Sequence, residues 1–351
     1  MKLTDLTQRA GEWLRGSGPR SDIVISSRIR LARNISGYPF LVRAGRNQRQ
    51  VLEKRLRDVI LASQISPQIL YVGLEEASEI DRQLLVERHL ISRPHAAAEG
   101  ARGVAINEDE SVAIMVNEED HLRLQVLRSG LQLDEAWEQI TAVDDQLESK
   151  LDFAFHPRFG YLTACPTNVG TGLRVSILAH LPALKLTGEI EKVFRVAKDM
   201  RLAVRGLWGE GTEATGDLYQ IGNQTTLGKS EEDILHDFQH EVIPKIIDLE
   251  HHARKVLASE RSMALDDKIC RALGVLRSAR LLASEETLFL LSHLRMGVNL
   301  ERLKGVDVRT INELFLLTQP AHLQKMQGKR LEGDARRAVR AQYIRQRLGA
   351  N

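Results

Sequence analysis

Cys165 is the residue whose neighbours in the sequence most clearly suggest chemistry. It ends the segment YLTAC and precedes Pro166 and a loop rich in glycine and hydroxyl side chains, TNVGTGLR. The reactive form of cysteine is the thiolate, which positive charge, hydroxyls and backbone N–H groups stabilise. The sequence therefore predicts a reactive cysteine at the end of a strand over 161–164. The alternative is a structural cysteine buried in the core, since free cysteine is among the most buried residue types.

Five arginines lie near predicted strand ends or glycine-rich loops: Arg28, Arg30, Arg123, Arg174 and Arg205. Arg28 and Arg30 are two positions apart in IVISSRIRLAR, so on a strand both side chains point to one face. Such a pair suits a phosphate group, because guanidinium groups offer forked donors. The alternative is a solvated strand face. The chain contains no GxxxxGK[ST] phosphate loop, so arginines would have to hold a nucleoside triphosphate.

Two carboxylates and a histidine accompany these arginines. Glu119 lies in the polar segment NEEDHLR, and Glu210 lies among the glycines of RGLWGEGTEA. Glycines at this density indicate a mobile loop or a close approach to a ligand. His89 ends a helix predicted over 76–89. The alternatives are a solvated charged loop for Glu119 and a capping or surface histidine for His89.

Composition narrows the class of protein. The 351 residues carry 49 basic and 47 acidic side chains. The net charge of +2 therefore gives no indication that the protein as a whole attracts a polyanion such as a nucleic acid. Only Cys165 and Cys270 are present, which excludes a disulfide framework and suits a reducing compartment. No Cys/His cluster has zinc-ligand spacing. The first residues lack the apolar core of a secretory signal, and no apolar run is long enough to span a bilayer. We expect a cytoplasmic protein.

The order of predicted elements indicates an α+β protein with an all-helical end. Alternating strand and helix patterns continue to about residue 225, and helical periodicity follows almost to the end. We therefore predict an α+β domain over 1–255 and a helical domain over 256–351. Further expectations are a short helix over 3–15, a helix start at Ser230, a capping box formed by Thr310 and Glu313, and a basic helix over 334–348.

Four segments together identify a known family. SSRIRLAR, NEEDHLR, CPTNVGTGLR and RGLWGEGTEA occur in the order and with the spacing typical of the phosphagen (guanidino) kinase family, and the resemblance covers about residues 22–250. The resemblance implies an antiparallel sheet flanked by helices, joined to a small helical domain, and ATP with Mg²⁺ as cofactors. It implies that Arg28, Arg30, Arg123, Arg174 and Arg205 hold the ATP phosphates, with His89 near the adenine. It also implies that Glu119 and Glu210 bind the guanidinium beside a reactive Cys165.

These residue types fit the reaction that the resemblance implies. A guanidinium has a pKa above about 12 and no lone pair available for attack, so a carboxylate must orient it and accept a proton. We assign Glu119 as the base and Glu210 as a second clamp. A Cys165 thiolate would polarise the guanidinium electrostatically and form no covalent phospho-intermediate. The arginines and Mg²⁺ would position the phosphoryl group and stabilise its charge.

Two departures from the enzymes that act on free creatine or arginine concern the substrate. Those enzymes carry a long helical segment before SSRxR with a loop that closes over the substrate, whereas 25 residues precede Ser26 here. An open site would admit an arginine side chain of a polypeptide. The helical tail after residue 260 also lacks a counterpart in them. Both departures resemble the protein-arginine kinase branch of the family.

That branch carries an RDxxRA-type motif associated with allosteric binding of phosphoarginine. Asp334, Arg337 and Ala338 match the motif, whereas Gly333 replaces its first arginine. Helical spacing places Asp334 and Arg337 on one face. The sequence thus predicts a phosphoarginine site there, and the alternative is a solvated basic helix.

The predicted function is ATP-dependent phosphorylation of arginine side chains in proteins, marking them for chaperone-protease degradation and relieving transcriptional repression under stress. The alternatives are a kinase of free arginine or another small guanidino compound, and a non-catalytic adaptor that binds phosphoarginine. The resemblance further implies an activating zinc-finger protein, a repressor substrate, a Clp-type chaperone-protease and a homodimer. We expect no direct contact with nucleic acid or membrane.

Overall fold

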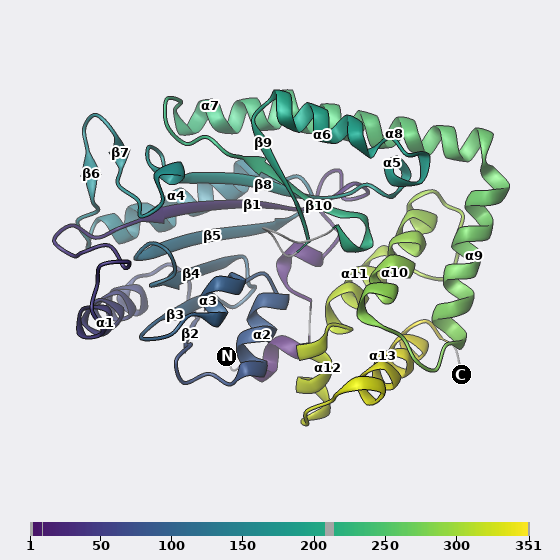
Figure 1. The fold of residues 1–351 in the computed structure, drawn as a ribbon, viewed down its shortest axis with the longest axis horizontal. Coiled ribbons are helices and arrows are strands. Elements are labelled where there is room, and N and C mark those ends of the chain that lie inside the picture. Colours follow the sequence, from purple (N-terminus) through teal and green to yellow (C-terminus); the bar gives the residue numbers. More distant parts are fainter. Residues whose placement is uncertain (1–2, 9, 208–213, 350–351) are drawn as a thin grey trace.

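The centre of the molecule is an eight-stranded sheet (Figure 1). The computed structural model describes residues 3–8, 10–207 and 214–349. Neighbouring strands are antiparallel, in the order β2-β3-β4-β5-β1-β8-β10-β9. The strands are β1 (Val24–Arg33), β2 (Ile69–Gly73), β3 (Gly103–Asn107), β4 (Val112–Val116), β5 (Leu122–Ser129), β8 (Leu173–His180), β9 (Leu202–Gly206) and β10 (Leu218–Asn223). A separate hairpin joins β6 (Phe155–His156) to β7 (Gly160–Tyr161).

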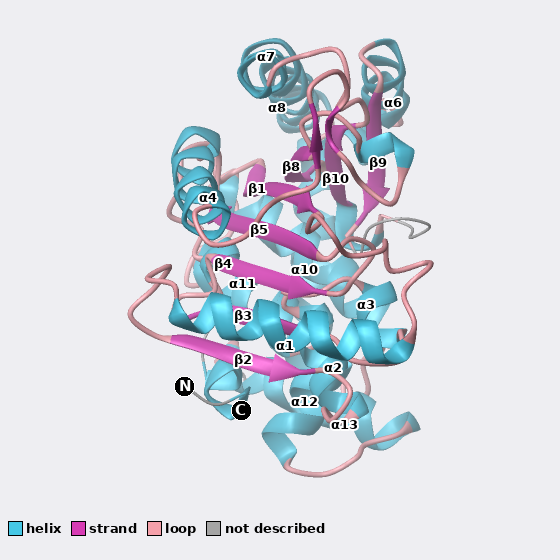
Figure 2. Ribbon diagram, turned by 90° about the vertical axis from the view of Figure 1, so that its left-hand side faces the viewer, coloured by secondary structure: helices cyan, strands magenta, loops and turns pink. Residues whose placement is uncertain are grey.

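Helices surround the sheet and continue beyond it. The first eight are α1 (Arg46–Ala62), α2 (Glu79–Glu87), α3 (Arg93–Ala97), α4 (Leu133–Glu148), α5 (Pro182–Thr187), α6 (Ile190–Asp199), α7 (Glu231–His236) and α8 (Ile243–Glu260). An all-helical part follows, with α9 (Ser262–Ser278), α10 (Ser284–Asn299), α11 (Val308–Leu317), α12 (Pro320–Gln327) and α13 (Gly333–Arg347). Figure 2 shows α6, α7 and α8 near the β9 end of the sheet and α12 and α13 near the β2 end. The predicted α+β fold, with an antiparallel sheet and a helical end, is confirmed.

Two predicted element boundaries are wrong for identifiable reasons. In place of one helix over 3–15, the structure has two 3-10 stretches, Leu3–Gln8 and Glu12–Leu14. The backbone of Gly11 is extended, and burial of Trp13 and Leu14 in the core determines the local path. At α11 the cap is Asp307, whose carboxylate accepts a hydrogen bond from the N–H of Thr310 at 2.6 Å. Thr310 therefore lies within the first turn and does not form the predicted capping box with Glu313.

Other local predictions are confirmed. Ser230 precedes α7 and accepts a hydrogen bond from the N–H of Asp233, as an N-cap should. The basic C-terminal helix is α13. Within the described residues, none of the helices has the length and apolar character needed to cross a membrane.

β1 is the central strand, between β5 and β8, and its two faces differ. Ile29 and Leu31 are buried in a core shared with residues of α1 and α4. Arg28 and Arg30 alternate with them and therefore project from the opposite face of the sheet. The period of two in the sequence thus separates a hydrophobic face from a charged one.

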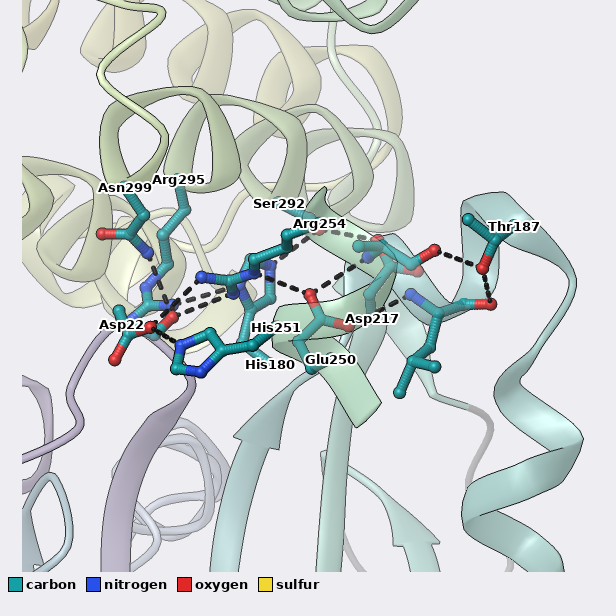
Figure 3. Close-up of polar contacts among 12 residues, drawn as sticks. Asp22, His180, Thr187, Asp217, Glu250, His251, Arg254, Ser292, Arg295 and Asn299 are labelled. Carbon is teal, nitrogen blue, oxygen red and sulfur yellow. Dashed lines mark hydrogen bonds and ion pairs between the residues drawn. The ribbon is translucent and has the colours of Figure 1, made fainter. Parts of the chain in front are cut away.

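The helical part is joined to the sheet through a buried polar network (Figure 3). Arg295 of α10 donates to Nδ1 of His180 at the end of β8 at 3.0 Å and to the carbonyl of Asp22 before β1 at 3.0 Å. Arg254 of α8 donates to the same carbonyl at 3.1 Å. Burial and the neighbouring arginines hold the pKa of His180 well below its usual value, so the ring is neutral. The ends of β1 and β8 are therefore tied to α8 and α10. The predicted boundary between residues 255 and 256 falls within α8 and stays a prediction.

Candidate active site

Five arginines gather on one face of the sheet because of strand register. Arg30 of β1 is directly opposite Arg174 of β8, and Arg28 is opposite Ser176. Arg123 of β5 is opposite Ala32 of β1. Arg205 of β9 is opposite Gln220 of β10, which in turn pairs with Leu178 of β8. Residues opposite each other share a face, so the structure brings all five predicted phosphate-binding arginines to the same side of the sheet. We call this side the arginine face.

The clustered charges repel one another. Burial, followed by the charges of Arg123 and Arg205, lowers the pKa of Arg28 to about 9. Burial and four neighbouring arginines lower the pKa of Arg30 well below its usual value. Its Nε has no hydrogen-bond partner among the residues that the structure describes. Guanidinium groups held this way favour an anionic ligand, which would relieve both repulsion and desolvation.

Two adjoining cavities lie over this face. The cysteine cavity, of about 360 Å³, is lined by residues that include Arg30, Glu119, Arg123, Cys165, Arg174 and Arg205. The histidine cavity, of about 470 Å³, includes Arg28, His89, Ser92, Ala98 and Gln125. Arg30, Glu118, Glu119, Arg123 and Arg205 line both cavities. The five predicted phosphate-binding arginines, Glu119 and Cys165 therefore line two cavities that share part of their walls.

Glu118 is a site residue that sequence reasoning missed. Both of its carboxylate oxygens accept from Nη1 of Arg123, at 2.9 and 2.8 Å, and Oε1 also accepts from the hydroxyl of Ser92 at 2.6 Å. Although burial of the carboxyl opposes ionisation, Arg123 and then Ser92 hold its pKa at about 2. The ionised Glu118 fixes Arg123 in place. Only the fold brings Ser92 to it, so no local sequence signal distinguishes Glu118 from its neighbour.

Glu119 has a different environment from Glu118. Its pKa is raised by burial and then by the negative charges of Asp120 and Glu118. The neighbouring Asp120 accepts from the side chain of Asn34 at 2.6 Å and from the N–H of Ala164 at 2.7 Å. Asp120 thereby fastens the loop that carries Glu119 to the loop that carries Cys165. A carboxylate with a raised pKa beside a cysteine is equipped to accept a proton.

Cys165 does not end a regular strand. β7 stops at Tyr161, and Cys165 precedes a 3-10 turn over Pro166–Asn168, so the predicted strand over 161–164 is too long. The reason is that Asp120 binds the N–H of Ala164, which a strand partner would otherwise occupy. The sulfur lies 3.0 Å from the hydroxyl of Thr167 and is partly exposed in the cysteine cavity. The alternative of a cysteine packed in the core is excluded.

His89 follows α2 in the left-handed backbone region, with φ of 59°. The side chain of Gln125 donates to its carbonyl at 2.7 Å, and Trp13 packs edge-on against its ring at 4.6 Å between centroids. Burial, then Arg28 and Arg93, lower the pKa of His89 to about 3, so its ring is neutral. A neutral ring held by Trp13 on one side can pack against an uncharged base.

Comparisons with known proteins identify the family. The family model described as "ATP:guanido phosphotransferase, C-terminal catalytic domain" matches residues 51–253, and the model described as "Protein-arginine kinase McsB C-terminal domain" matches residues 262–351. The chain is 45% identical to the protein-arginine kinase of Halothermothrix orenii over 99% of both chains, and 48% identical to that of Symbiobacterium thermophilum over 100% of both. The chain belongs to the protein-arginine kinase family.

Solved structures resemble the catalytic part of this protein-arginine kinase family member. The duplicated taurocyamine kinase from Schistosoma mansoni, with bound transition-state analogue components, is 26% identical with a TM-score of 0.62, over 72% of this chain and 35% of that one. Lombricine kinase is 26% identical with a TM-score of 0.56, over 69% of this chain and 71% of that one. Both are enzymes with guanidino substrates in their names. The catalytic class, ATP:guanido phosphotransferase, is thus the class of this chain.

Of the predicted site residues that the structure describes, Asp334, Arg337 and Ala338 do not line the two cavities. Glu210 lies outside the described residues, so its role stays a prediction. Asp334 and Arg337, on the first turns of α13, are exposed and paired with each other at 3.2 Å, with Ala338 beside them. Figure 1 shows α13 at the opposite end of the molecule from the β6–β7 hairpin, which adjoins the Cys165 loop. The phosphoarginine site predicted from the sequence therefore lies apart from the face of the sheet that carries the five arginines.

Proposed function

We propose that this protein transfers the γ-phosphoryl group of ATP to arginine side chains of other proteins. The observation that carries the proposal is the pair of adjoining cavities that five arginines, Glu119 and Cys165 line together. The names of the full-length relatives support the same reaction. Taurocyamine and lombricine kinases, named for small guanidino compounds, support the chemistry but not the size of the substrate.

The arginine face fits the triphosphate of ATP. Arg28, Arg30 and Arg205 carry like charges that repel one another, and a polyphosphate would neutralise them. His89 would lie against the adenine in the histidine cavity. Magnesium would enter with the nucleotide, because the described residues contain no group of three metal-ligating side chains. When bound, it would reduce the charge of the phosphate oxygens.

Glu119, Cys165 and the arginines divide the work of phosphoryl transfer. The attacking guanidinium nitrogen of the substrate forms a bond to the γ-phosphorus while the bond between that phosphorus and the ADP oxygen breaks. The nitrogen loses its proton to Glu119, whose raised pKa makes it a stronger base than an ordinary carboxylate. Cys165, as a thiolate, would polarise the guanidinium without bonding to phosphorus. Glu210 would be the second carboxylate clamp.

The wider role follows the family resemblance. We propose that phosphorylated proteins are passed to a Clp-type chaperone-protease and that a transcriptional repressor is one substrate in a cytoplasmic stress response. An activating zinc-finger protein and a homodimer belong to the same proposal. Residues 1–255 would form the catalytic domain and 256–351 the helical domain. Asp334, Arg337 and Ala338 would bind phosphoarginine as an allosteric signal.

The test is phosphotransfer in vitro with neutral handling, because phosphoarginine is labile in acid. The purified protein is incubated with Mg-ATP and an unfolded arginine-rich protein, beside the variants Glu119→Ala and Cys165→Ala. If the natural protein forms phosphoarginine and the variants Glu119→Ala and Cys165→Ala do not, the result supports both the site and the reaction. Transfer to free arginine alone would instead favour the small-substrate kinase. ATP binding without transfer to either substrate, in the presence or absence of cell extract, would favour the adaptor.

A further inference from the structure

A third cavity, of about 610 Å³, lies beside the active site. It is larger than the cysteine cavity and the histidine cavity. We call it the arginine cavity. Its walls are formed by the start of α1, by α2 and Glu75 before it, and by residues 97–102, which begin at the end of α3. Its lining includes Arg46, Arg49, Glu75, Arg82, Glu99 and Arg102, with four alanines between them. Such a volume holds several side chains of a ligand.

The arginine cavity carries excess positive charge. Four arginines and two glutamates give its lining a net formal charge of +2. The glutamates are both exposed, and the one ion pair among these residues in the described structure, Arg46 with Glu75, is long at 3.8 Å. Exposed pairs of this kind contribute little. An anionic ligand would therefore face more positive than negative charge.

Three of the four arginines are held by main-chain carbonyls. Arg49 donates to Leu41 at 2.7 Å, and Arg82 donates to Ala77 at 2.7 Å. Arg102 is 5% exposed and donates to the carbonyls of His95 and Gly100, both at 2.9 Å. Carbonyl oxygens orient a guanidinium without cancelling its charge. The cavity thus has one buried guanidinium, Arg102, and two that are held in fixed orientations, Arg49 and Arg82. This arrangement favours the binding of carboxylates.

The arginine cavity adjoins the histidine cavity, which Glu119 also lines. Ala98 lines both it and the histidine cavity, so the short segment formed by α3 and Ala98 is the wall between them. Ser92, the N-cap of α3, donates to Glu118, which holds Arg123. A polypeptide that presents one side chain to Glu119 can therefore pass over α3 and place nearby residues in the arginine cavity.

We propose that the arginine cavity binds the carboxylates of an acidic segment that flanks the target arginine in a polypeptide substrate. This inference rests on the proposed function, because it names a feature of the protein substrate. The nucleotide phosphates have their own arginines across α3, and a lone small anion would fill little of 610 Å³. The alanines at positions 44, 97, 98 and 101 leave space for the main chain of an extended peptide.

The experiment compares peptides that each contain one arginine. One set carries three glutamates at varied distances on either side, and the matched set carries glutamines. Initial rates of phosphoarginine formation are measured for the natural protein, Arg46→Glu and the control Arg55→Glu. Arg46 is exposed, and its only ion pair with another described residue is the long one to Glu75. Arg55 is an exposed arginine of the same helix that contacts Tyr38 and does not line the arginine cavity. Both variants change the net charge equally.

We expect the best acidic peptide to have a KM about fivefold below that of its glutamine counterpart at low salt, a difference that shrinks as salt screens exposed charges. Arg46→Glu should abolish the preference, and Arg55→Glu should keep it. Should Arg46→Glu fail to fold, Arg46→Gln replaces it and should weaken the preference. Equal KM values for both peptide sets, or a preference for acidic peptides that persists in Arg46→Glu, would overturn the inference while leaving the proposed function intact. Phosphorylation of neither set would overturn the proposed function itself.

Discussion

Replacing Glu118 by glutamine should cost stability without touching the predicted base. A carboxyl pKa of about 2 instead of 4.5 corresponds to about 3 kcal/mol in favour of the ionised form in the folded protein, at about 1.4 kcal/mol for each tenfold change in proton affinity. The side chain is 5% exposed, so solvent screens little of this effect. Glutamine keeps the shape but loses the charge opposite Arg123. We expect Glu118→Gln to lower the free energy of unfolding by about 2–3 kcal/mol at pH 7.

The pH dependence identifies the cause. Because the pKa of Glu118 is lower in the folded protein, its stabilisation is complete above about pH 4.5 and is lost as the pH falls toward 2. The difference between the natural protein and Glu118→Gln, measured by urea unfolding, should therefore narrow from pH 5 downward. Glu118→Gln should also raise the KM for ATP, since Arg123 is released. The control Glu119→Gln should abolish transfer and leave stability nearly unchanged.

One outcome would refute this reasoning. If Glu118→Gln unfolds at the same urea concentration as the natural protein at both pH 7 and pH 4, the carboxylate does not stabilise the fold through Arg123. A loss of stability that is constant over the whole pH range would point instead to packing. Loss of transfer together with unchanged KM for ATP would assign Glu118 a catalytic role that its contacts do not suggest.

Three further predictions concern the base, the arginine face and the attachment of α12. If Glu119 accepts the proton, kcat/KM measured against pH should fall as the pH drops through the raised pKa of Glu119. A fall in kcat/KM only at the pKa of an ordinary carboxyl group would contradict this. Arg30→Met should raise the free energy of unfolding of the nucleotide-free protein, measured with urea, by about 1–2 kcal/mol and should weaken ATP binding, because like charges surround Arg30. A lower free energy of unfolding would refute the repulsion. Glu87→Ala should destabilise the protein by about 2–4 kcal/mol, because Glu87 accepts from the N–H groups of Ala321 and His322 at 2.8 and 3.1 Å. An unchanged urea midpoint for Glu87→Ala would show that α12 does not depend on this contact.

Sequence patterns located much of the site because strand periodicity is local. Alternation in SSRIRLAR placed Arg28 and Arg30 on one face, and the structure has them there. The same reasoning overextended the strand before Cys165, because Asp120, distant in sequence, binds Ala164. It also proposed one helix at the amino end, where burial of Trp13 against His89 and the core decides the path. Prediction from local sequence pattern fails where a residue distant in the sequence forms the hydrogen bond or packs against the segment.

The sequence by itself determined which residue types are available and which face of each strand they occupy. Side-chain alternation is a property of the extended backbone, so it follows from order alone. Only the tertiary structure decided that Glu118 is the buried partner of Arg123 and that Glu119 lines the cavity that holds Cys165. Two adjacent carboxylates are equivalent along the chain. They become different because Arg123 and Ser92, brought from other elements, surround Glu118 and lower its pKa, while burial and then like charges raise the pKa of Glu119.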